Sequence, residues 1–527
     1  MASTIVRSPF PDVDIPDVPY HEFVLARAAR YGDRPALIDG PTGRTISYRE
    51  LVAQVRRCAA GLAARGLRKR DVVAIYSPNL PEYVVAFYGV SMAGGAATTV
   101  NSLSTLEELV VQLDDAGARF LICAVPFLER ALDAGGRSGV EQLFVFGEGA
   151  FPGATAFAEL LAGDAEPPRP AIDPAEDVVA LPYSSGTTGL PKGVMLTHRN
   201  LVANLCQTEP VTVLTEGQVE RVSAVLPFYH SYGLTVLMGG SVWLGATLVS
   251  MPLFDLEEYL REVQAYRISR LFVVPPILIG LAKHPAVARY DLSSVRGIYS
   301  GAAPLGKDLE QEVAGRLRTF VTQGYGLTET SPVLATNPQD RARSGSVGLL
   351  VPNTECKVVD PASGEDLDPS EDGELCFRGP QIMKGYLNRP AETAAMLSPD
   401  GWLRTGDVGH VDADGYVYVV DRAKELIKYK GHQVAPAELE GLLLTHPGIA
   451  DAAVVGHVDP ERGEIPKAFV VAKPGEQLDA AEVMEFVAAR VAPHKKVRAV
   501  EFIDQIPKAL SGKILRRVLI ERDAMAR

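Results

Sequence analysis

The sequence predicts an α/β protein with a large N-terminal domain, residues 1–421, and a small α+β C-terminal domain, residues 422–527. The chain has 527 residues, 47% of them hydrophobic, which is too long for one hydrophobic core. Short β-rich segments alternate with amphipathic helices through most of the large domain, a pattern typical of parallel sheets. After Asp421 the pattern changes to helices separated by short strands, which indicates a second, more compact unit.

The first helix and strand signals of the large domain follow one another closely. Ser47 and Glu50 have the spacing of a capping box and predict the start of a helix, which Gly66 ends. Residues 71–77, DVVAIYS, predict a buried strand. Pro81 then opens a second, apolar helix. This alternation indicates α/β units from the start of the chain.

Three later β-rich segments each end in a loop that contains glycine. They are RISRLFVVPP (267–276), VRGIYSGAAP (295–304) and RTFVTQGYGLTET (318–330). Because ligands of parallel sheets bind at the carboxyl ends of the strands, these loops predict one shared site. From about Val347 to Val420, short strands with turns predict a small barrel-like part or a meander instead.

One stretch of the large domain, residues 222–254, contains no Asp, Glu, Lys or Arg. A membrane-spanning helix needs about 20 continuous apolar residues. Pro227, His230 and the pair at 239–240 interrupt this stretch, so we expect a buried strand, loop and helix. We therefore expect no stable membrane insertion.

The composition favours small-molecule chemistry in a cytoplasmic protein. The formal net charge is −13, which disfavours nucleic acid as a partner. The N-terminal MASTIVRSPFPDVD has no charged-then-apolar signal. The cysteines are single and lack metal-site spacing, so they predict reduced thiols without a disulfide framework or zinc. They are Cys58, Cys123, Cys206, Cys356 and Cys376.

The C-terminal domain is less acidic than the rest of the chain. From Arg422 onward there are 17 basic and 15 acidic residues, and residues 491–527 hold 9 Lys/Arg against 4 Asp/Glu. This local basicity suits a small mobile domain that delivers cations to an anionic ligand. Three helices are predicted in this domain, over residues 435–448, 479–493 and 511–527.

Residues 183–194, YSSGTTGLPKGV, form a glycine loop that is rich in hydroxyl groups. Its glycines let the backbone approach a ligand with the N–H groups turned inward, and Lys192 adds a positive charge. A polyphosphate matches these properties, although Pro191-Lys192-Gly193 departs from the Walker pattern of P-loop kinases and ATPases. We expect the loop to lie between a strand over residues 177–183 and the first part of a helix over residues 196–205. The predicted phosphate-binding residues are Ser184, Ser185, Gly186, Thr187, Thr188, Gly189 and Lys192.

This loop resembles the phosphate loop of the adenylate-forming superfamily, which includes acyl-CoA synthetases, peptide-synthetase adenylation domains and beetle luciferases. Further segments agree with the superfamily in order and spacing from about residue 20 to the C-terminus. They are LPFYHSYG (226–233), SGAAPLG (300–306), QGYGLTET (323–330), GWLRTGD (401–407), DRAKELIKYKGHQVAPAELE (421–440) and PKALSGKILR (507–516). Within the superfamily the chain is most similar to the 4-coumarate–CoA ligase branch.

The resemblance implies an AMP-forming acid–thiol ligase that uses ATP, Mg²⁺ and coenzyme A. A carboxylate attacks the α-phosphorus of ATP, pyrophosphate leaves, and the acyl group of the acyl-AMP passes to the thiol. Since both first reactants are anions, catalysis requires positioning and charge neutralisation. The resemblance assigns Glu329 and Thr187 to Mg²⁺, Thr328 to the α-phosphate, and the glycine loop to the departing phosphates.

By the same resemblance, Asp407 and Arg422 bind the ribose, and Lys513 reaches the carboxylate and α-phosphate oxygens during adenylation. The adenine is expected between the 301–303 backbone and the ring of Tyr325. In the segments 300–306 and 323–330, the residues assigned to the nucleotide are Gly301, Ala302, Ala303, Gln323, Gly324, Tyr325 and Gly326.

The second half-reaction requires a different arrangement, because Lys513 occupies the face along which the thiol must approach. The resemblance implies that the small domain rotates about Lys424. A second face of that domain then lines the thiol tunnel and contacts AMP. The residues on this face are Lys428, Lys430, Gly431 and Gln433.

His230 is expected to gate the acyl pocket and to contact the carboxylate. The walls of this pocket are small or aromatic and uncharged, so the acyl tail should be apolar or aromatic. By resemblance they are Tyr229, Tyr232, Val236, Ala302, Gly324, Pro332 and Val333. We expect an aryl-propenoate such as 4-coumarate or cinnamate, or a medium-chain fatty acid, as the substrate.

Three other functions stay open at this stage. An adenylating enzyme that loads the phosphopantetheine of a carrier protein shares the tunnel chemistry. A luciferase-like monooxygenase uses the same adenylate but needs oxygen. A nucleotide sensor without catalysis predicts loss of Lys513 or Glu329, and both residues are present. We expect the protein to be a monomer or a weak homodimer.

Overall fold

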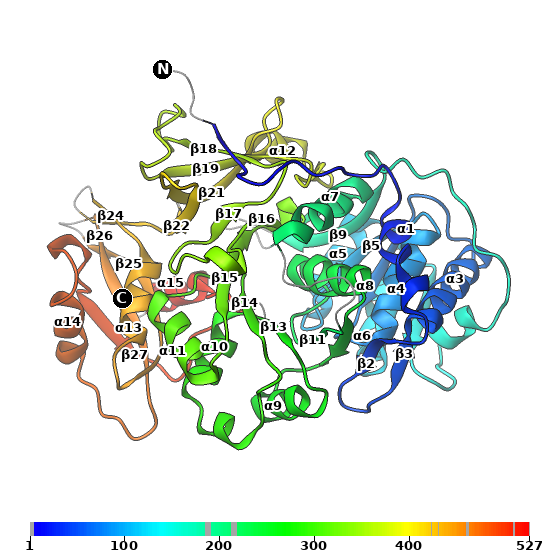
Figure 1. The fold of residues 1–527 in the computed structure, drawn as a ribbon, viewed down its shortest axis with the longest axis horizontal. Helices are drawn as coiled ribbons and strands as arrows, with labels where there is room; N and C mark the ends of the chain where they lie inside the picture. Colours follow the sequence, from blue (N-terminus) through cyan, green and yellow to red (C-terminus); the bar gives the residue numbers. More distant parts are fainter. Residues whose placement is uncertain are drawn as a thin grey trace.

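The structure is a computed structural model that describes residues 5–184, 191–211, 219–422, 424–429, 432–459, 463–509 and 512–525. Its described part contains three sheets with helices packed against them (Figure 1). The two larger sheets make up the body of the molecule. The third sheet lies at one side with its own helices (Figure 1).

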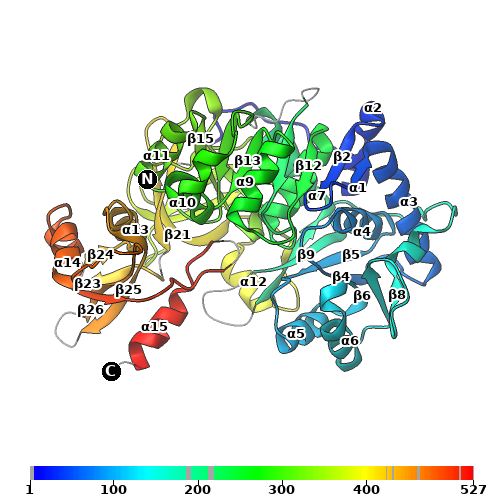
Figure 2. The same ribbon diagram turned by 90° about the horizontal axis from the view of Figure 1, so that it is seen from below.

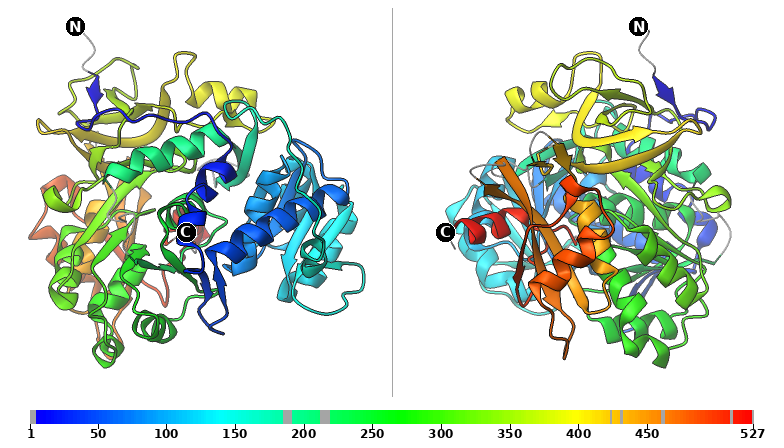
Figure 3. Two further views of the ribbon diagram at one scale, coloured as in Figure 1. Left: turned by 45° about the vertical axis from the view of Figure 1, so that its right-hand side comes forward. Right: turned by 90° about the vertical axis from the view of Figure 1, so that its left-hand side faces the viewer.

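The largest sheet has 14 strands within the described residues, and it changes character halfway. The strands from β15 to β2 pair in parallel, whereas those from β16 to β1 pair antiparallel. In spatial order they are β1 (Val6–Arg7), β18 (Glu355–Val359), β19 (Gly373–Arg378), β21 (Leu403–Val411), β22 (Tyr416–Arg422), β17 (Gly348–Leu350), β16 (Val333–Thr336), β15 (Val321–Gly326), β14 (Gly297–Ser300), β13 (Arg270–Val273), β11 (Arg221–Ala224), β12 (Thr247–Ser250), β2 (Pro35–Asp39) and β3 (Thr45–Ser47). Figure 3 shows β1, in dark blue, beside the yellow antiparallel strands.

The second sheet is parallel except at one end. Strands β9 to β8 pair in parallel, and β10 adds antiparallel to β9 and to β20. In spatial order they are β20 (Gly385–Tyr386), β10 (Lys192–Thr197), β9 (Val178–Ser184), β5 (Ala96–Val100), β4 (Val72–Tyr76), β6 (Ala118–Ala124), β7 (Gln142–Phe146) and β8 (Thr155–Ala156). The two sheets together confirm the predicted parallel α/β architecture and the antiparallel part that follows it.

The helices of the large sheets begin and end near the positions that the sequence predicts. Ser47 and Glu50 form the capping box of α3, and Pro81 is the first residue of α4. The helices are α1 (Tyr20–Leu25), α2 (Ala28–Tyr31), α3 (Tyr48–Ala64), α4 (Pro81–Met92), α5 (Leu106–Ala116), α6 (Leu128–Arg137), α7 (His198–Thr208), α8 (Gly240–Leu244), α9 (Leu256–Ala265), α10 (Pro275–Lys283), α11 (Lys307–Leu317) and α12 (Pro390–Met396).

The stretch 222–254 folds into the predicted strand, loop and helical segment, followed by a second strand that was not predicted. It contains most of β11, a π-helical turn over Tyr232–Gly239, α8 and β12. None of the described helices has both the length and the apolar character that a membrane crossing requires.

The third sheet has a hydrophobic core of its own, formed by residues between 427 and 500. Its strands are β24 (His432–Val434), β23 (Ile427–Tyr429), β26 (Gly463–Ala472), β25 (Ile449–Asp459) and β27 (Ala499–Phe502), and its helices are α13 (Pro436–Leu444), α14 (Ala480–Ala488) and α15 (Arg516–Met525). The segment before α15 runs from this unit towards the larger sheet (Figure 2). Lys283 of α10 donates to the carbonyl of Leu444 at 3.0 Å and joins the two units.

The strand and the helix expected on either side of the glycine loop are both present, with a further strand between them. The loop joins β9 to β10, which pair antiparallel with Lys192 opposite Ser184, and α7 begins only after β10. The strand β10, which the sequence did not predict, therefore lies between the glycine loop and α7, with β20 beyond it at the edge of the sheet. The strand β10 is short and follows Pro191, so loop signals dominate its sequence.

The five cysteines occupy buried positions in the structure, and all five are free. Among the residues that the structure describes, no group of three or more His, Cys, Asp or Glu side chains could hold a metal ion.

Two buried histidines should make the stability of the fold depend on pH. His198 Nδ1 accepts from the backbone N–H of Tyr20 at 3.0 Å, and His21 Nδ1 lies 3.0 Å from Ser91 Oγ. Burial lowers the pKa of His21 to about 3 and that of His198 to about 4, although Asp177 opposes the second shift. Both folded-state values lie below the unfolded value of 6.5, so the unfolded chain binds more protons between pH 6.5 and about 4.

We therefore predict that the free energy of unfolding falls as the pH drops through this window, by up to about 1.4 kcal/mol per pH unit for each histidine. Denaturant unfolding at neutral and mildly acidic pH measures the loss. His198→Asn keeps an acceptor for Tyr20 and should flatten the dependence. An unchanged slope in His198→Asn contradicts the prediction.

Candidate active site

A cavity of about 1370 Å³ lies where the two larger sheets meet the third unit. It collects residues from the ends of β9, β14 and β15, from the 227–236 segment and from the C-terminal segment before α15. The predicted site residues that line it are Ser184, Lys192, Tyr229, His230, Tyr232, Val236, Gly301, Ala302, Gly324, Tyr325, Gly326, Thr328, Glu329, Pro332, Val333, Arg422, Lys424 and Lys513. The structure thus brings together residues that are more than 300 positions apart in the sequence.

Glu329 is buried at one side of this cavity and is held by two hydroxyl groups. Its Oε1 accepts from Ser184 Oγ at 2.9 Å and from the Tyr386 hydroxyl at 2.8 Å. Burial and the charge of Glu329 raise the pKa of Tyr386, so its hydroxyl stays protonated and donates. The ammonium group of Lys192 lies 5.1 Å from the centroid of the Tyr386 ring, as in a cation–π contact.

His230 and Thr328 lie on the same side of the cavity as Lys513. His230 Nδ1 accepts from the backbone N–H of Tyr232 at 3.3 Å. Burial, and then the positive charge of Lys513, lower the pKa of His230 to about 4, so the imidazole is neutral at pH 7. Thr328 Oγ1 lies 3.4 Å from Ser231 Oγ. A neutral ring beside an ammonium group can donate to an anion without adding a second cation.

Lys513 is carried by a tight turn just ahead of α15. The N–H of Ala509 donates to the carbonyl of Lys513 at 2.8 Å, and Gly512 has a positive φ of 79°. A Cβ on Gly512 would lie 2.9 Å from Pro276 in α10, so only glycine allows this close approach. Burial and the charge of Arg422 lower the pKa of Lys513, while Glu425 and Asp407 oppose the shift.

Asp407 and Arg422 lie opposite each other on β21 and β22. Arg422 Nε is 3.3 Å from Asp407 Oδ1, and the Tyr325 hydroxyl donates to Oδ2 at 2.5 Å. Asp407 is buried, and this burial raises its pKa against the opposing effects of Arg422 and Tyr325. Tyr325 and Arg422 therefore line the cavity and at the same time fix the carboxylate behind them.

The turn after β14 is packed against the aromatic part of the cavity. A Cβ on Gly301 would lie 2.8 Å from the Tyr232 ring, and Ala302 has a positive φ of 65°. Gln323 does not line the cavity; its side-chain amide exchanges two hydrogen bonds, of 3.1 and 3.2 Å, with the backbone of Leu305. Gln323 therefore supports the turn that contains Ala303 from the side away from the cavity.

The end of the cavity near Tyr232 is aromatic and uncharged. The Tyr232 hydroxyl donates to the carbonyl of Tyr299 at 3.1 Å. The rings of Phe272 and Tyr299 are stacked, with centroids 5.1 Å apart. Val236, Pro332 and Val333 complete this end. Such walls suit a flat or extended apolar group.

Lys428 and Gln433 lie outside this cavity. They face each other across β23 and β24, and Lys428 is exposed. Lys424, by contrast, lines the cavity at the start of the third unit. The remaining predicted residues lie outside the described residues, namely Ser185, Gly186, Thr187, Thr188, Gly189, Lys430 and Gly431.

The sequence did not single out several residues that the structure places at this site. Tyr386 binds Glu329, and Arg516 forms ion pairs with Glu425 at 3.0 Å and with Glu440 at 2.8 Å, three residues after Lys513. For Tyr386 the sequence gives only a weak signal, an aromatic residue in the turn-rich GYLNRP stretch. Arg516 is the first residue of a charge-rich helix, α15, and in the sequence it resembles an ordinary surface charge.

The chain matches the AMP-binding enzyme family over residues 24–387 and the AMP-binding enzyme C-terminal domain over residues 438–513. It is 43% identical to 4-coumarate–CoA ligase 3 of Oryza sativa subsp. japonica over 98% of this chain and 95% of that protein. It is also 43% identical to 4-coumarate–CoA ligase of Pinus taeda, over 98% and 97%.

Two solved structures share the whole fold. ATP-bound MatB from Rhodopseudomonas palustris has a TM-score of 0.86 and 31% identity, over 96% of this chain and 99% of that one. The anthranilate CoA ligase AuaEII in complex with anthranoyl-AMP has a TM-score of 0.90 and 26% identity, over 98% of both chains. The resemblance inferred from the sequence motifs is confirmed: this chain belongs to the AMP-binding enzyme family.

Proposed function

We propose that this protein is an ATP-dependent acid–CoA ligase that activates a carboxylic acid as acyl-AMP and transfers the acyl group to coenzyme A. The observation that carries the proposal is the position of Lys513, which enters the cavity beside His230 and Arg422. Relatives named as 4-coumarate–CoA ligases, matched over nearly their full length, support coenzyme A as the acceptor. We also propose the division into domains 1–421 and 422–527.

In the adenylation step the protein must bring two anions together. Lys513 and neutral His230 would bind the acid carboxylate and the α-phosphate, with Thr328 donating to the same phosphate. Removing water from this site strengthens each of these interactions in the transition state. Asp407 and Arg422 would fix the ribose, so that the α-phosphorus lies in line with the attacking oxygen.

The residues near Glu329 fit a magnesium ion. They offer hard oxygen donors, and the orientation of the Glu329 carboxylate is fixed by Ser184 and Tyr386. Mg²⁺ in nucleotide sites typically binds one or two carboxylates together with the phosphates. We propose that Glu329 holds the ion, which would neutralise charge on the pyrophosphate as it leaves. Lys192 would supply a further positive charge to the same group.

The transfer to coenzyme A would use a second orientation of the small domain. In the present orientation Lys513 lines the cavity and would block one face of the acyl carbonyl, whereas Lys428 and Gln433 lie outside the cavity. Rotation about Lys424 would exchange these two faces. The exposed position of Lys428 and its separate strand pairing support this proposal.

For the acid we propose an aryl-propenoate of the 4-coumarate or cinnamate type. The stacked Phe272 and Tyr299 rings and the uncharged residues around them form a flat apolar wall. No lysine or arginine among the described residues lines this end of the cavity to bind a second carboxylate. We further propose a cytoplasmic monomer or weak homodimer that binds neither nucleic acid nor membranes stably.

The first prediction concerns the reaction itself. With ATP, Mg²⁺ and 4-coumarate or cinnamate, the protein should release pyrophosphate, and with coenzyme A it should form a thioester visible by its absorbance. A comparison of the rates with medium-chain fatty acids and dicarboxylic acids then shows which acid the acyl pocket prefers. Release of AMP without consumption of coenzyme A would favour the loading of a carrier protein instead.

The second prediction separates the two half-reactions by the loss of Lys513. Lys513→Ala should slow adenylation by on the order of 10²–10³-fold, because a preorganised charge is lost from the transition state. Thioester formation from supplied acyl-AMP and coenzyme A should stay nearly unchanged. Pyrophosphate release and thioester absorbance measure the two steps, and an equal loss of both contradicts the assignment.

The third prediction is that the loss of Lys428 affects thioester formation and not adenylation. Lys428→Ala should leave pyrophosphate release intact and slow thioester formation from acyl-AMP by roughly 10–100-fold, the loss expected for one charge-assisted hydrogen bond. Lys357, a lysine on β18 of the large domain that pairs with Asp366, provides a control as Lys357→Ala. If Lys428→Ala matches this control in both assays, Lys428 is no part of the site.

A further inference from the structure

A tyrosine that the sequence did not predict connects two parts of the nucleotide side of the cavity. Tyr386 is buried, with 4% of its surface exposed. Its hydroxyl donates to Glu329 Oε1, and its ring lies beneath the ammonium group of Lys192. The two residues expected to act on the phosphates and on the metal therefore contact opposite parts of one side chain.

The backbone around Tyr386 is attached to the same two elements. Tyr386 lies opposite Val194 in the pairing of β20 with β10, and the N–H of Leu387 donates to the carbonyl of Gly193 at 2.8 Å. The N–H of Met383 donates to the carbonyl of Glu329 at 2.9 Å. These backbone contacts hold the Tyr386 ring beside Glu329, and its hydroxyl lies 2.8 Å from Glu329 Oε1 and 2.8 Å from the Met396 sulfur.

The two hydroxyls distinguish the oxygens of the Glu329 carboxylate. Both hydrogen bonds from Ser184 and Tyr386 reach Oε1, and the described residues make no hydrogen bond to Oε2. A carboxylate with one oxygen fixed in this way presents the other to a ligand in a defined direction. Hydrogen bonds to a ligating carboxylate orient it and raise its affinity for the ion.

We propose that Tyr386 is a positioning residue that, together with Ser184, holds Glu329 in the orientation that binds the nucleotide-associated divalent cation. The inference rests on the proposed function, since it assumes that the cavity binds ATP with a metal ion. It adds a residue from β20 to the site and gives that residue a defined role, because Tyr386 couples the hairpin of the glycine loop to the metal-binding carboxylate.

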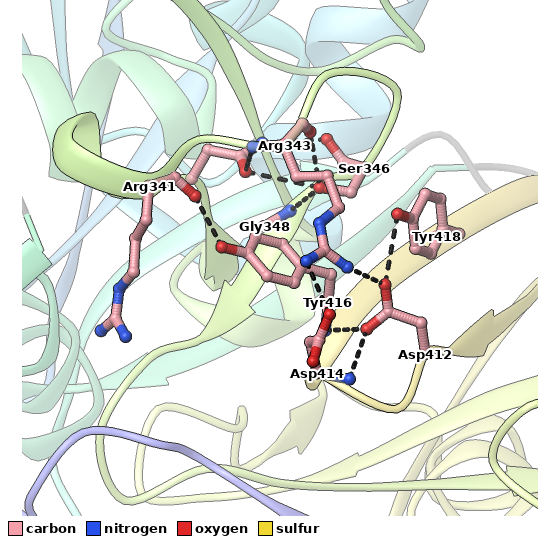
Figure 4. A network of polar contacts seen from close by, with 9 residues as sticks. Arg341, Arg343, Ser346, Gly348, Asp412, Asp414, Tyr416 and Tyr418 are labelled. Carbon is pink, nitrogen blue, oxygen red and sulfur yellow. Dashed lines mark hydrogen bonds and ion pairs between the residues drawn. The ribbon is translucent and has the colours of Figure 1, made fainter.

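A second tyrosine provides a matched control, because it has the same local chemistry away from the cavity. The ring of Tyr416 lies under the guanidinium of Arg343, 3.9 Å from its centroid, and its hydroxyl donates to the carbonyl of Arg341 at 2.6 Å (Figure 4). Arg343 also pairs with Asp414 at 2.8 Å. Tyr416 is buried to a similar degree, with 6% exposed, and does not line the cavity.

The test measures how much Mg²⁺ tightens the binding of a nucleotide that cannot react. Calorimetry with α,β-methylene ATP, with MgCl₂ or with EDTA, gives the ratio of the two dissociation constants. Tyr386→Phe should reduce this ratio by about tenfold and leave the affinity in EDTA unchanged. Tyr416→Phe should keep the wild-type ratio. In a Glu329→Gln background, Tyr386→Phe should cause no further loss, because the two residues act as one unit.

The outcomes separate this inference from the proposed function. A wild-type ratio in Tyr386→Phe, an equal loss in Tyr416→Phe, or a loss of affinity in EDTA as well would overturn the positioning role while the ligase activity stands. A wild-type protein that binds no analogue and releases no pyrophosphate would overturn both. If Tyr386→Phe does not fold, Ser184→Ala removes the other donor to Oε1, and a full metal effect in that variant overturns the proposal.

Discussion

The placement of Lys513 is the constraint on which the arrangement of this molecule depends. The ammonium group of Lys513 comes from the small unit and lies largely buried in a cavity that the large unit helps to form. Burial disfavours the charged form of this group. The carboxylates of Glu425 and Asp407 offset part of this cost. The bare backbone of Gly512 against Pro276 lets the turn approach closely enough. A side chain at position 512 would move the cation away from His230.

The small unit holds this turn through contacts of its own. Arg516, one turn beyond Lys513, is fixed by Glu440 and Glu425, so the start of α15 moves with α13. Across the boundary, Asp421 Oδ2 accepts from the N–H of Ala437 in the first turn of α13 at 2.9 Å. A carboxylate at a helix N-terminus is a favourable but exchangeable contact. Such a boundary is compatible with the proposed rotation about Lys424.

The sequence predicted what depends on local pattern and missed what depends on long-range pairing. The capping box of Ser47 and Glu50 and the proline start of α4 are local signals, and both elements form where expected. The hairpin of β9 and β10 was missed because β10 is defined by its partners and not by its own residues. Tyr386 was missed for the same reason, since the pairing of β20 with β10 brings it to Glu329, 57 residues away.

Comparison of Tyr386 with Tyr416 shows why local chemistry alone could not identify the site. Each ring lies under a cation and each hydroxyl donates to an oxygen, so a description of either residue by its contacts gives the same result. The difference is the acceptor itself: the backbone carbonyl of Arg341 in one case, and the carboxylate of Glu329, which lines the cavity, in the other. At Tyr416 these contacts join parts of the fold, whereas at Tyr386 we propose that they orient Glu329. The functional value of a fixed side chain therefore depends on whether the group that it fixes lines a cavity where a ligand can bind.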